Sequence, residues 1–296
     1  MIRVAFTLIG GKDWMGGQNY LYNLLDSLVC YQSKRLAPVL FTGEDCCETV
    51  KRFQTIKGLE IISTPFLNSR RRKISLLQAF FLGKDVPLQK LFKEHQIDLI
   101  FEAAQFFGWR VGIPAIAWIP DFQHKLLPHM FPVTRWLKRE SGFRLQLAGR
   151  RTIMVSSEDA KYHCEHHYSL KGNIIRTIHF AIPPGSEIQH QTARKVADSY
   201  GLPQHFFFIP NQFYQHKNHE LVLEAMGLLR QRGEHIVVAA SGNQTDPRNP
   251  GYFPDFLNKL EKYHLENEFK LLGMIPYSHL LSLMCACTAM LNPSLF

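Results

Sequence analysis

Lys217 lies between two apolar segments of the chain, at a position where a cation can neutralise a phosphate. The stretch NQFYQHKNH, residues 211–219, follows the apolar run FFFIP and precedes a segment with apolar residues at helical spacing. Asn218 stands where that helix would have its N-cap. Unpaired N–H groups and the helix dipole favour an anion there, and a lysine without one costs about 0.3–1 kcal/mol. We expect a diphosphate at this point, although a solvated loop lysine explains the fragment equally well.

A second candidate pair is Asp121 and His124 in the stretch WIPDFQHKLLP, residues 118–128. Asp121 ends a predicted strand and His124 follows three residues later, so we expect both side chains to face a cleft. An acid beside a histidine can act as a base, orient a hydroxyl or contact a phosphate. The alternative is that Asp121 caps a turn and that His124 packs on aromatic rings. This segment alone does not separate the two interpretations.

Strands and helices alternate along the chain in a way that would position these residues. Apolar runs typical of strands occur at 2–9, 37–42, 59–63, 97–101, 113–119 and 152–157, and again at 206–210, 235–241, 269–275 and 288–293. Helical spacing separates several of them, as at 86–95 and 134–149. The alternation predicts an α/β fold with parallel sheets covered on both faces. Because the segment AIPPGSEIQHQ interrupts the pattern, we expect two Rossmann-like domains facing a cleft, residues 1–185 and 186–296.

The loops that follow strands are where open α/β sheets bind ligands. The first loop, GGKDWMGGQN, contains Gly16 and Gly17, where a phosphate or sugar can approach the backbone closely. It does not match G-x-G-x-x-G, so this signal is weak. His163 and His167 are four residues apart in a predicted helix, but no third ligand follows at a recognisable spacing. We therefore expect no metal site.

The charge of the chain narrows the classes of partner. The 296 residues include 34 Lys and Arg against 25 Asp and Glu, a net charge of +9. No zinc-finger spacing or RNA-binding aromatic motif accompanies this charge, so we expect no nucleic acid. Phosphorylated small molecules or an anionic membrane face remain. Basic clusters occur at 70–73 and at Arg135, Lys138 and Arg139, where a solvated face and a peripheral membrane contact are the alternatives.

Two further features of the sequence bear on the compartment. The six cysteines include no C-x-x-C pair and no secreted framework, which predicts reduced thiols in a cytoplasmic protein. No apolar stretch reaches the ~18 residues that a membrane span needs. We therefore expect a cytoplasmic chain whose membrane contact, if it has one, is peripheral on the cytoplasmic face.

Several of these segments together resemble the GT-B-fold retaining glycosyltransferases of the glycosyl transferase group 1 family, which includes sucrose synthases and phosphatidylinositol mannosyltransferases. The best matched pieces are GGQNYLYNLL, WIPDFQH, SSEDA, NQFYQHKNH and LNPSLF, in this order along the chain. The resemblance implies transfer of a hexosyl group from a nucleotide-diphospho-sugar donor to a carbohydrate or lipid-linked acceptor, with retention, in polysaccharide or glycolipid synthesis. It implies no cofactor and no metal, because basic groups and helix N-termini neutralise the leaving diphosphate.

The same resemblance assigns roles to individual residues. Lys217 corresponds to the basic residue on the donor diphosphate, and Ile275 lies where members hold the base through main chain. Ser241 and Gly242 correspond to the small pair that ends the second strand of the nucleotide domain. The residues so implied in donor binding are Gly16, Gly17, Asn211, His216, Lys217, Ser241, Gly242 and Ile275. Asp121 and His124 are the candidate catalytic residues on the acceptor side.

The chain departs from the family pattern in three places. Pro120 replaces a histidine that many members have before the aspartate, so His124 is the substitute. Members often pair an arginine with the lysine, and here Asn211 or His216 must serve. The chain ends at Phe296, before the E-x7-E stretch of the family.

From this ending we expect an incomplete second domain in which TAMLNP is a strand buried on both faces. We also expect exposed apolar surface, weak donor binding and little transfer. The alternatives to a transferase are a non-catalytic nucleotide-sugar or membrane-surface binding protein and a nucleotide-sugar epimerase. A transferase consumes its donor only together with an acceptor, whereas an epimerase needs none.

Overall fold

A computed structural model describes residues 1–8, 15–103, 105–170, 172–181 and 190–296. The chain forms two compact units, Met1–Leu126 with Val133–Pro184 and Leu127–Pro132 with Gly185–Phe296. The expected domain boundary between residues 185 and 186 lies outside the described residues. The segment Leu127–Pro132 groups with the second unit, although the sequence pattern places it inside the first domain.

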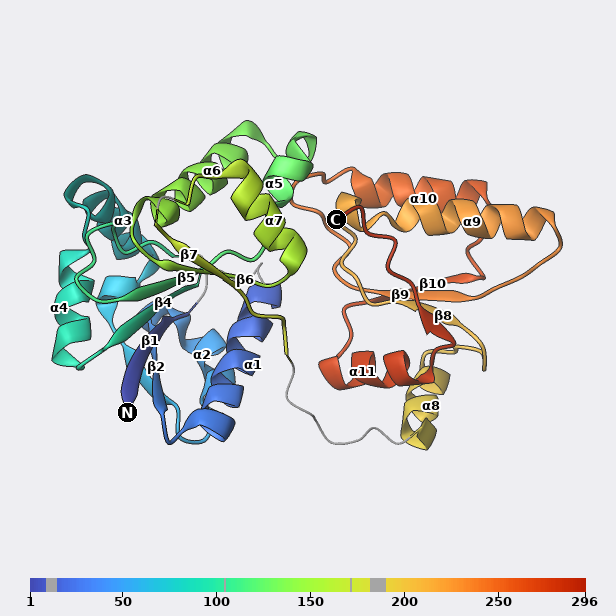
Figure 1. Cartoon of the computed structure of the whole chain (residues 1–296). Helices are drawn as coiled ribbons and strands as arrows, with labels where there is room; N and C mark the ends of the chain where they lie inside the picture. The colour runs from blue at the N-terminus through green and yellow to red at the C-terminus, as the bar shows by residue number, and fades with distance from the viewer. Residues whose placement is uncertain (9–14, 104, 171, 182–189) are drawn as a thin grey trace. The chain divides into compact units, whose positions relative to one another are not determined.

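The first unit is built on a seven-stranded parallel sheet with the strand order β3-β2-β1-β4-β5-β6-β7 (Figure 1). The strands are β1 Ile2–Thr7, β2 Leu36–Thr42, β3 Glu60–Ser63, β4 Leu99–Ala103, β5 Ala115–Trp118, β6 Thr152–Val155 and β7 Ile174–Thr177. Strand β7 was not predicted from the sequence. Its residues are only half-buried or exposed, as at the edge of a sheet, so it lacks the continuous apolar run of a central strand.

Helices cover both faces of this sheet, as the strand composition predicts. They are α1 Met15–Gln32, α2 Cys47–Phe53, α3 Ser69–Leu82, α4 Val86–Glu94, α5 Gln123–Leu126, α6 Val133–Ala148 and α7 Glu158–His167, with 3-10 turns η1 Glu44–Cys46 and η2 Pro65–Leu67. A further 3-10 turn, η3 Pro128–Met130, lies in the segment that groups with the second unit. Phe6 of β1 packs with Leu21 and Leu25 of α1. The adjacent Ala5 belongs to a second cluster that contains Leu88 and Phe92 of α4. Successive strand residues thus serve opposite cores, because side chains alternate across a strand.

The second unit repeats the same topology on a smaller scale. Its parallel sheet has the order β10-β9-β8-β11. The elements are α8 His190–Ser199, β8 Phe207–Ile209, η4 Gln215–Lys217, α9 His219–Gln231, β9 Val238–Ser241, α10 Tyr252–Lys262, β10 Phe269–Gly273, α11 Tyr277–Ala286 and β11 Ala289–Met290. The order of the strands reverses between β1 and β4 in the first sheet and between β8 and β11 in the second. Such reversals are where open α/β sheets bind ligands.

Strand β11 differs from the expectation that TAMLNP is buried on both faces. The strand is two residues long and pairs with β8 at the edge of the sheet. Ala289 is exposed, and Met290 is 51% exposed. An edge strand has a neighbour on one side only, so its side chains are buried only where a helix lies over them. The prediction of burial on both faces is therefore wrong for these residues.

Within the described ranges, no helix combines the length and apolar character needed to cross a bilayer.

Candidate functional site

The reversal between β8 and β11 brings together the loops that follow these two strands. Leu295 N donates to His216 O at 2.9 Å, and Asn218 Nδ2 donates to Pro293 O at 3.3 Å. Asn211 Nδ2 lies 3.4 Å from Asn292 Oδ1. The candidates Asn211, His216 and Lys217 thus lie at the carboxyl end of β8, beside the loop of its neighbour β11. This is the position at which the topology predicts a ligand.

Lys217 ends the short helix η4, directly before α9. Asn218 occupies the N-cap position of α9, as predicted, but its φ of 57° places it in the left-handed region, and its side chain makes no capping hydrogen bond. Its amide instead contacts Pro293 O. The first turn of α9 therefore has no side-chain cap from Asn218, and its positive dipole end lies next to the Lys217 cation.

An arginine from a different loop lies against this segment and was not predicted from the sequence. Arg248 Nη2 is 2.6 Å from His216 Nδ1. The carboxylate of Asp246, which is almost fully buried, accepts hydrogen bonds from Gln215 N at 3.0 Å and Arg248 N at 2.9 Å. Asp246 thereby ties the loop after β9 to η4. Arg248 follows His216 by 32 residues in the chain, so only the fold brings this guanidinium to the segment.

A polar pocket of about 350 Å³ adjoins Arg248. All of its lining residues belong to the second unit. They are His129, Met130, Phe131, Pro132, Gln215, Asp246, Arg248 and Asn249. The ring of Phe131 lies 5.4 Å from the Arg248 guanidinium carbon, a distance typical of a cation–π contact.

Ser241 is the last residue of β9, and Gly242 follows it where three loops converge. Gly242 has a φ of +144°, and a Cβ at this residue would lie 2.4 Å from Asn211 O. Gly242 N donates to Gly273 O at 2.8 Å, and Phe213 N donates to Asn243 O at 2.9 Å. Only glycine allows this approach of the loops after β8, β9 and β10.

The neighbouring candidates Ser241 and Ile275 lie at the end of β9 and after the end of β10. Ser241 is buried, and its Oγ has no hydrogen-bond partner among the described residues. Ile275, after β10, is half-buried against the cluster that contains Phe208 and Leu283. The surroundings of these two residues do not test a contact with a nucleotide. Their expected roles in donor binding therefore stay predictions.

Gly16 and Gly17 belong to the first unit and lie in the first turn of α1. Gly16 is exposed, with no atom within 4 Å of the position of a Cβ, whereas Gly17 is buried. Residues 9–14 of the preceding loop lie outside the described residues. The position of both glycines at a helix N-terminus is compatible with an anion nearby.

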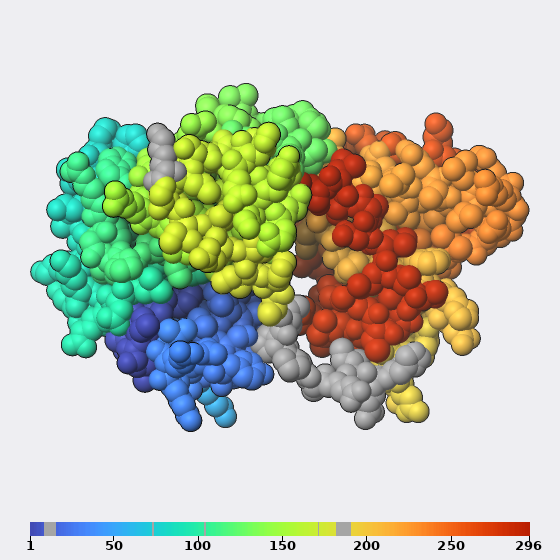
Figure 2. All heavy atoms as spheres, viewed as in Figure 1, coloured from blue at the N-terminus to red at the C-terminus, as the bar shows by residue number. Residues whose placement is uncertain are grey.

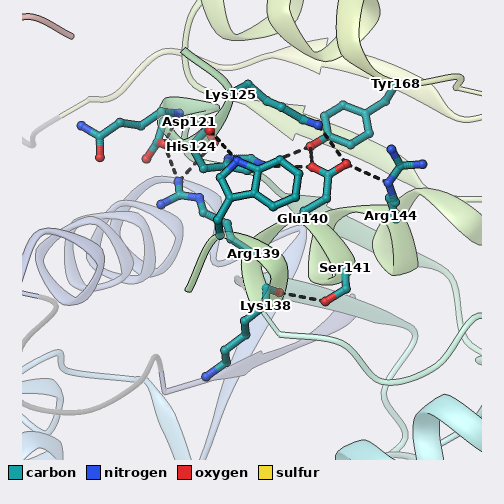
Figure 3. A network of polar contacts seen from close by, with 11 residues as sticks. Asp121, His124, Lys125, Lys138, Arg139, Glu140, Ser141, Arg144 and Tyr168 are labelled. Carbon is teal, nitrogen blue, oxygen red and sulfur yellow. Dashed lines mark hydrogen bonds and ion pairs between the residues drawn. The ribbon is translucent and has the colours of Figure 1, made fainter. Parts of the chain in front are cut away.

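Asp121 caps the start of α5, as the simpler of the two interpretations predicts. Its Oδ1 accepts from Gln123 N at 2.9 Å and also contacts Arg139 Nη2 of α6 (Figure 3). Arg139 Nη2 further donates to Asp121 O at 3.2 Å. Arg139 therefore holds the turn after β5 from within the unit, so it is not simply one more charge of a basic surface.

His124 does not face a cleft, and this part of the prediction is wrong. The residue is fully buried, and its ring packs edge-on against Phe143 at 5.2 Å between centroids. Its Nε2 lies 3.1 Å from Glu140 Oε2 and 3.3 Å from the Tyr168 hydroxyl. Burial lowers the pKa of His124, so we assign the neutral ring with its proton on Nε2, facing the carboxylate.

Glu140 of α6 is the centre of this network (Figure 3). It accepts hydrogen bonds from the Tyr168 hydroxyl at 2.6 Å and Arg144 Nε at 2.7 Å, and Lys125 Nζ lies at 2.9 Å. Burial alone would raise the pKa of Glu140, but the hydrogen bonds from Tyr168, Lys125, His124 and Arg144 outweigh it and lower the pKa to about 2. The carboxylate thus stays ionised at neutral pH and fixes α5 and α7 to α6.

The histidines of α7 form a short stack. His163 Nε2 lies 3.4 Å from Asp159 Oδ1, and the rings of His163 and His167 are parallel at 5.8 Å. Among the described residues, no group of three or more His, Cys, Asp or Glu is arranged to hold a metal.

Comparison with known proteins bears on the fold. The chain matches no protein-family model, and no curated protein is similar to it in sequence. Among solved structures, HepE of Anabaena in complex with UDP-glucose is similar, with a TM-score of 0.65 and 15% identity over 98% of this chain and 73% of HepE. A glycosyltransferase of Rickettsia africae has a TM-score of 0.63 and 12% identity over 99% of this chain and 72% of its own.

The similar structures also include an epimerase. UDP-N-acetylglucosamine 2-epimerase from Rickettsia bellii matches with a TM-score of 0.51 and 13% identity over 98% of this chain and 73% of its own. At these identities the matches define the fold. The prediction of a GT-B-like α/β fold with two Rossmann-like domains is confirmed.

The close approach at Gly242 gives a first prediction. Gly242→Ala should lower the free energy of unfolding of the second unit by about 2–4 kcal/mol, because it combines a strained φ with a clash against Asn211 O. Gly233→Ala is the matched control, since Gly233 also has a positive φ but nothing within 4 Å of its Cβ position. Denaturant unfolding measures both variants. Equal losses would mean that the backbone approach is not tight.

The network around Glu140 gives a second prediction. Because its pKa falls from 4.5 to about 2 on folding, the ionised carboxylate stabilises the first unit above pH 4.5. This contribution, on the order of 3 kcal/mol, is lost as the pH falls from 4.5 towards 2. Glu140→Gln should be less stable than the native chain at neutral pH, and the difference should shrink across that window.

The control for this measurement is Glu48→Gln, because Glu48 forms an exposed surface pair with Lys51. Its stability should follow the native chain at every pH. A Glu140→Gln difference that stays constant from pH 6 to pH 2 would contradict the role of the ionised carboxylate.

Proposed function

We propose that this chain is a glycosyltransferase that uses a nucleotide-diphospho-sugar donor and transfers the sugar to an acceptor hydroxyl with retention. The observation that carries the proposal is the set of cationic and amide groups at the reversal between β8 and β11. Lys217, the N-terminus of α9 and the Arg248 guanidinium against His216 lie in that region. HepE, of the same fold, is found with UDP, with UDP-glucose and with UDP and glucose.

The donor diphosphate would lie at the carboxyl ends of β8 and β11. A leaving diphosphate carries negative charge that cations and helix N-termini stabilise without a metal ion. In this arrangement Lys217 contacts a phosphate oxygen, and Arg248 and His216 support the same charge. Gly242 lets the loops after β8 and β9 meet beside the donor, and the main chain at Ile275 holds the base.

Asp121 is the group we propose for the acceptor side. Its carboxylate lies at the end of β5, and Arg139 and the amide of Gln123 fix its orientation through Oδ1. A fixed carboxylate can orient a hydroxyl for attack. His124 would not contact the acceptor. Its buried ring stabilises the α5 turn through its contact with Glu140. We further propose that the acceptor is a carbohydrate or a lipid-linked sugar, and that the chain, whose six cysteines are free thiols, works in the cytoplasm.

An epimerase is the second candidate, because the Rickettsia bellii enzyme has the same fold. The two activities differ in what becomes of the donor. Incubation with UDP-, GDP- and ADP-sugars, with and without carbohydrate acceptors, should release nucleoside diphosphate only when an acceptor is present. A sugar nucleotide converted to its epimer without an acceptor would establish the epimerase. Binding without any turnover would favour a nucleotide-sugar binding protein.

Lys217 gives the sharpest test of the donor site. Lys217→Ala should weaken binding of the nucleotide sugar by about 1.5–3 kcal/mol, the value of a hydrogen bond to a charged group. The free energy of unfolding should hardly change. Isothermal titration calorimetry measures the affinity, with Lys262→Ala as control, since Lys262 is an exposed lysine of α10 in the same unit. Identical affinities for the native chain and Lys217→Ala would remove the lysine from the donor site.

A further inference from the structure

Helix α3 turns its apolar side chains to solvent and its polar or small ones to the protein. Ile74, Leu77 and Phe81 follow the helical spacing i, i+3, i+7 and are 61%, 60% and 74% exposed. Arg72, Ser75 and Ala79 follow the same spacing on the opposite side and are buried. A surface helix of a globular protein normally has the reverse arrangement.

Polar contacts hold α3 in place. Arg72 Nη1 pairs with the buried Asp85 Oδ2 at 2.7 Å, and Ser75 Oγ also contacts this carboxylate. Arg72 Nη2 donates to Phe106 O at 2.8 Å, and Nε donates to Gln105 Oε1 at 3.0 Å. Ile74, Leu77 and Phe81 are more than half exposed and are not part of these polar contacts. Their exposure therefore needs a reason other than the fold.

Helix α3 lies at the outer edge of the first unit, where this part of the chain reaches the surface (Figures 1 and 2), and six of its apolar residues are exposed. We call this surface the α3 face. It consists of Ile74, Leu76, Leu77, Phe80, Phe81 and Leu82. The rings of Phe80 and Phe81 lie 5.2 Å apart, and Phe80 also contacts the ring of Trp109 at 6.1 Å. An apolar surface of this kind marks an interaction site.

Basic residues border the α3 face at both ends. Arg70 and Arg71 are exposed in the first turn of the helix, and Lys84 follows its last turn. Residues 69–84 contain no Asp or Glu. The carboxylate of Asp85 forms an ion pair with Arg72. Asp45, which precedes the helix, accepts a hydrogen bond from Ser69 N. The charges on the helix are therefore of one sign.

We propose that the α3 face binds the surface of an anionic lipid bilayer. Apolar side chains beside Lys and Arg are the composition of interfacial helices, in which the apolar residues enter the acyl boundary and the cations contact headgroups. A second copy of the chain fits less well, because two α3 faces in contact would bring basic residues together with no acidic residue in the face to pair with them. The proposal rests on α3 alone and does not depend on sugar transfer.

Vesicle sedimentation of the full chain tests the proposal. Binding should be strong to vesicles of phosphatidylcholine mixed with phosphatidylglycerol, weak to phosphatidylcholine alone, and reduced by added salt, because exposed charges are screened. The triple variant Ile74→Ser/Leu77→Ser/Phe81→Ser should bind at least about tenfold more weakly. Leu228→Ser is its control, since Leu228 of α9 is 58% exposed in the other unit.

A charge variant separates the two components of binding. Arg70→Glu/Arg71→Glu should also weaken binding at least about tenfold, and only to the anionic vesicles. The control Lys34→Glu/Arg35→Glu makes the same change of charge at two exposed residues before β2 and should bind like the native chain. Equal binding to neutral and anionic vesicles would overturn the proposal. So would a dimer of the native chain that the triple variant converts to a monomer.

Phe81→Trp keeps the test decisive if the triple variant does not fold. Phosphatidylglycerol-containing vesicles with brominated acyl chains should quench its fluorescence beyond the quenching of the native chain, whose Trp109 lies close by. Leu228→Trp should show no such increase. Absence of additional quenching in Phe81→Trp would show that the helix does not enter the bilayer.

Discussion

The backbone approach between Gly242 and Asn211 is the constraint on which the candidate donor site depends. A Cβ at residue 242 would lie 2.4 Å from Asn211 O, so the loops after β8 and β9 can meet only through glycine. Two further features use this approach. Phe213 N reaches Asn243 O, and Asp246 binds Gln215 N, which places Arg248 against His216. One glycine thus allows a strand-to-helix loop and a guanidinium from a second loop to act at the same place.

The candidate acceptor side is organised by two neighbouring residues of α6. Arg139 holds Asp121, and the next residue, Glu140, holds His124, Lys125 and Tyr168 (Figure 3). Arg139 and Glu140 are adjacent in α6, and both contact residues of the α5 turn. A shift of α6 would therefore move the whole turn. In the proposed reaction His124 therefore supports the position of Asp121 and does not itself touch the acceptor.

The fold could be predicted largely from local patterns, whereas the contacts of the site could not. Alternating apolar runs and helical spacing indicated parallel sheets, because central strands are covered on both faces. Strand β7 escaped notice because an edge strand carries little apolar signal. The burial of His124 depends on Glu140 and Tyr168, and the partner of His216 is Arg248, more than thirty residues away. Such pairs form only after the chain has folded. For the same reason, the pattern of charges in the sequence did not reveal that Arg72 pairs with Asp85 and Arg139 with Asp121.

Amide hydrogen exchange with and without a nucleotide sugar is the most direct measurement of the central claim, which is that the loops after β8 and β9 bind the donor diphosphate. With at least one of UDP-, GDP- or ADP-glucose at saturation, the amides of residues 211–219 and 241–248 should exchange more slowly. The amides of α3 and of the Glu140 network should be unchanged. Protection that is absent from both loops at a saturating donor, or confined to other segments, would contradict the account.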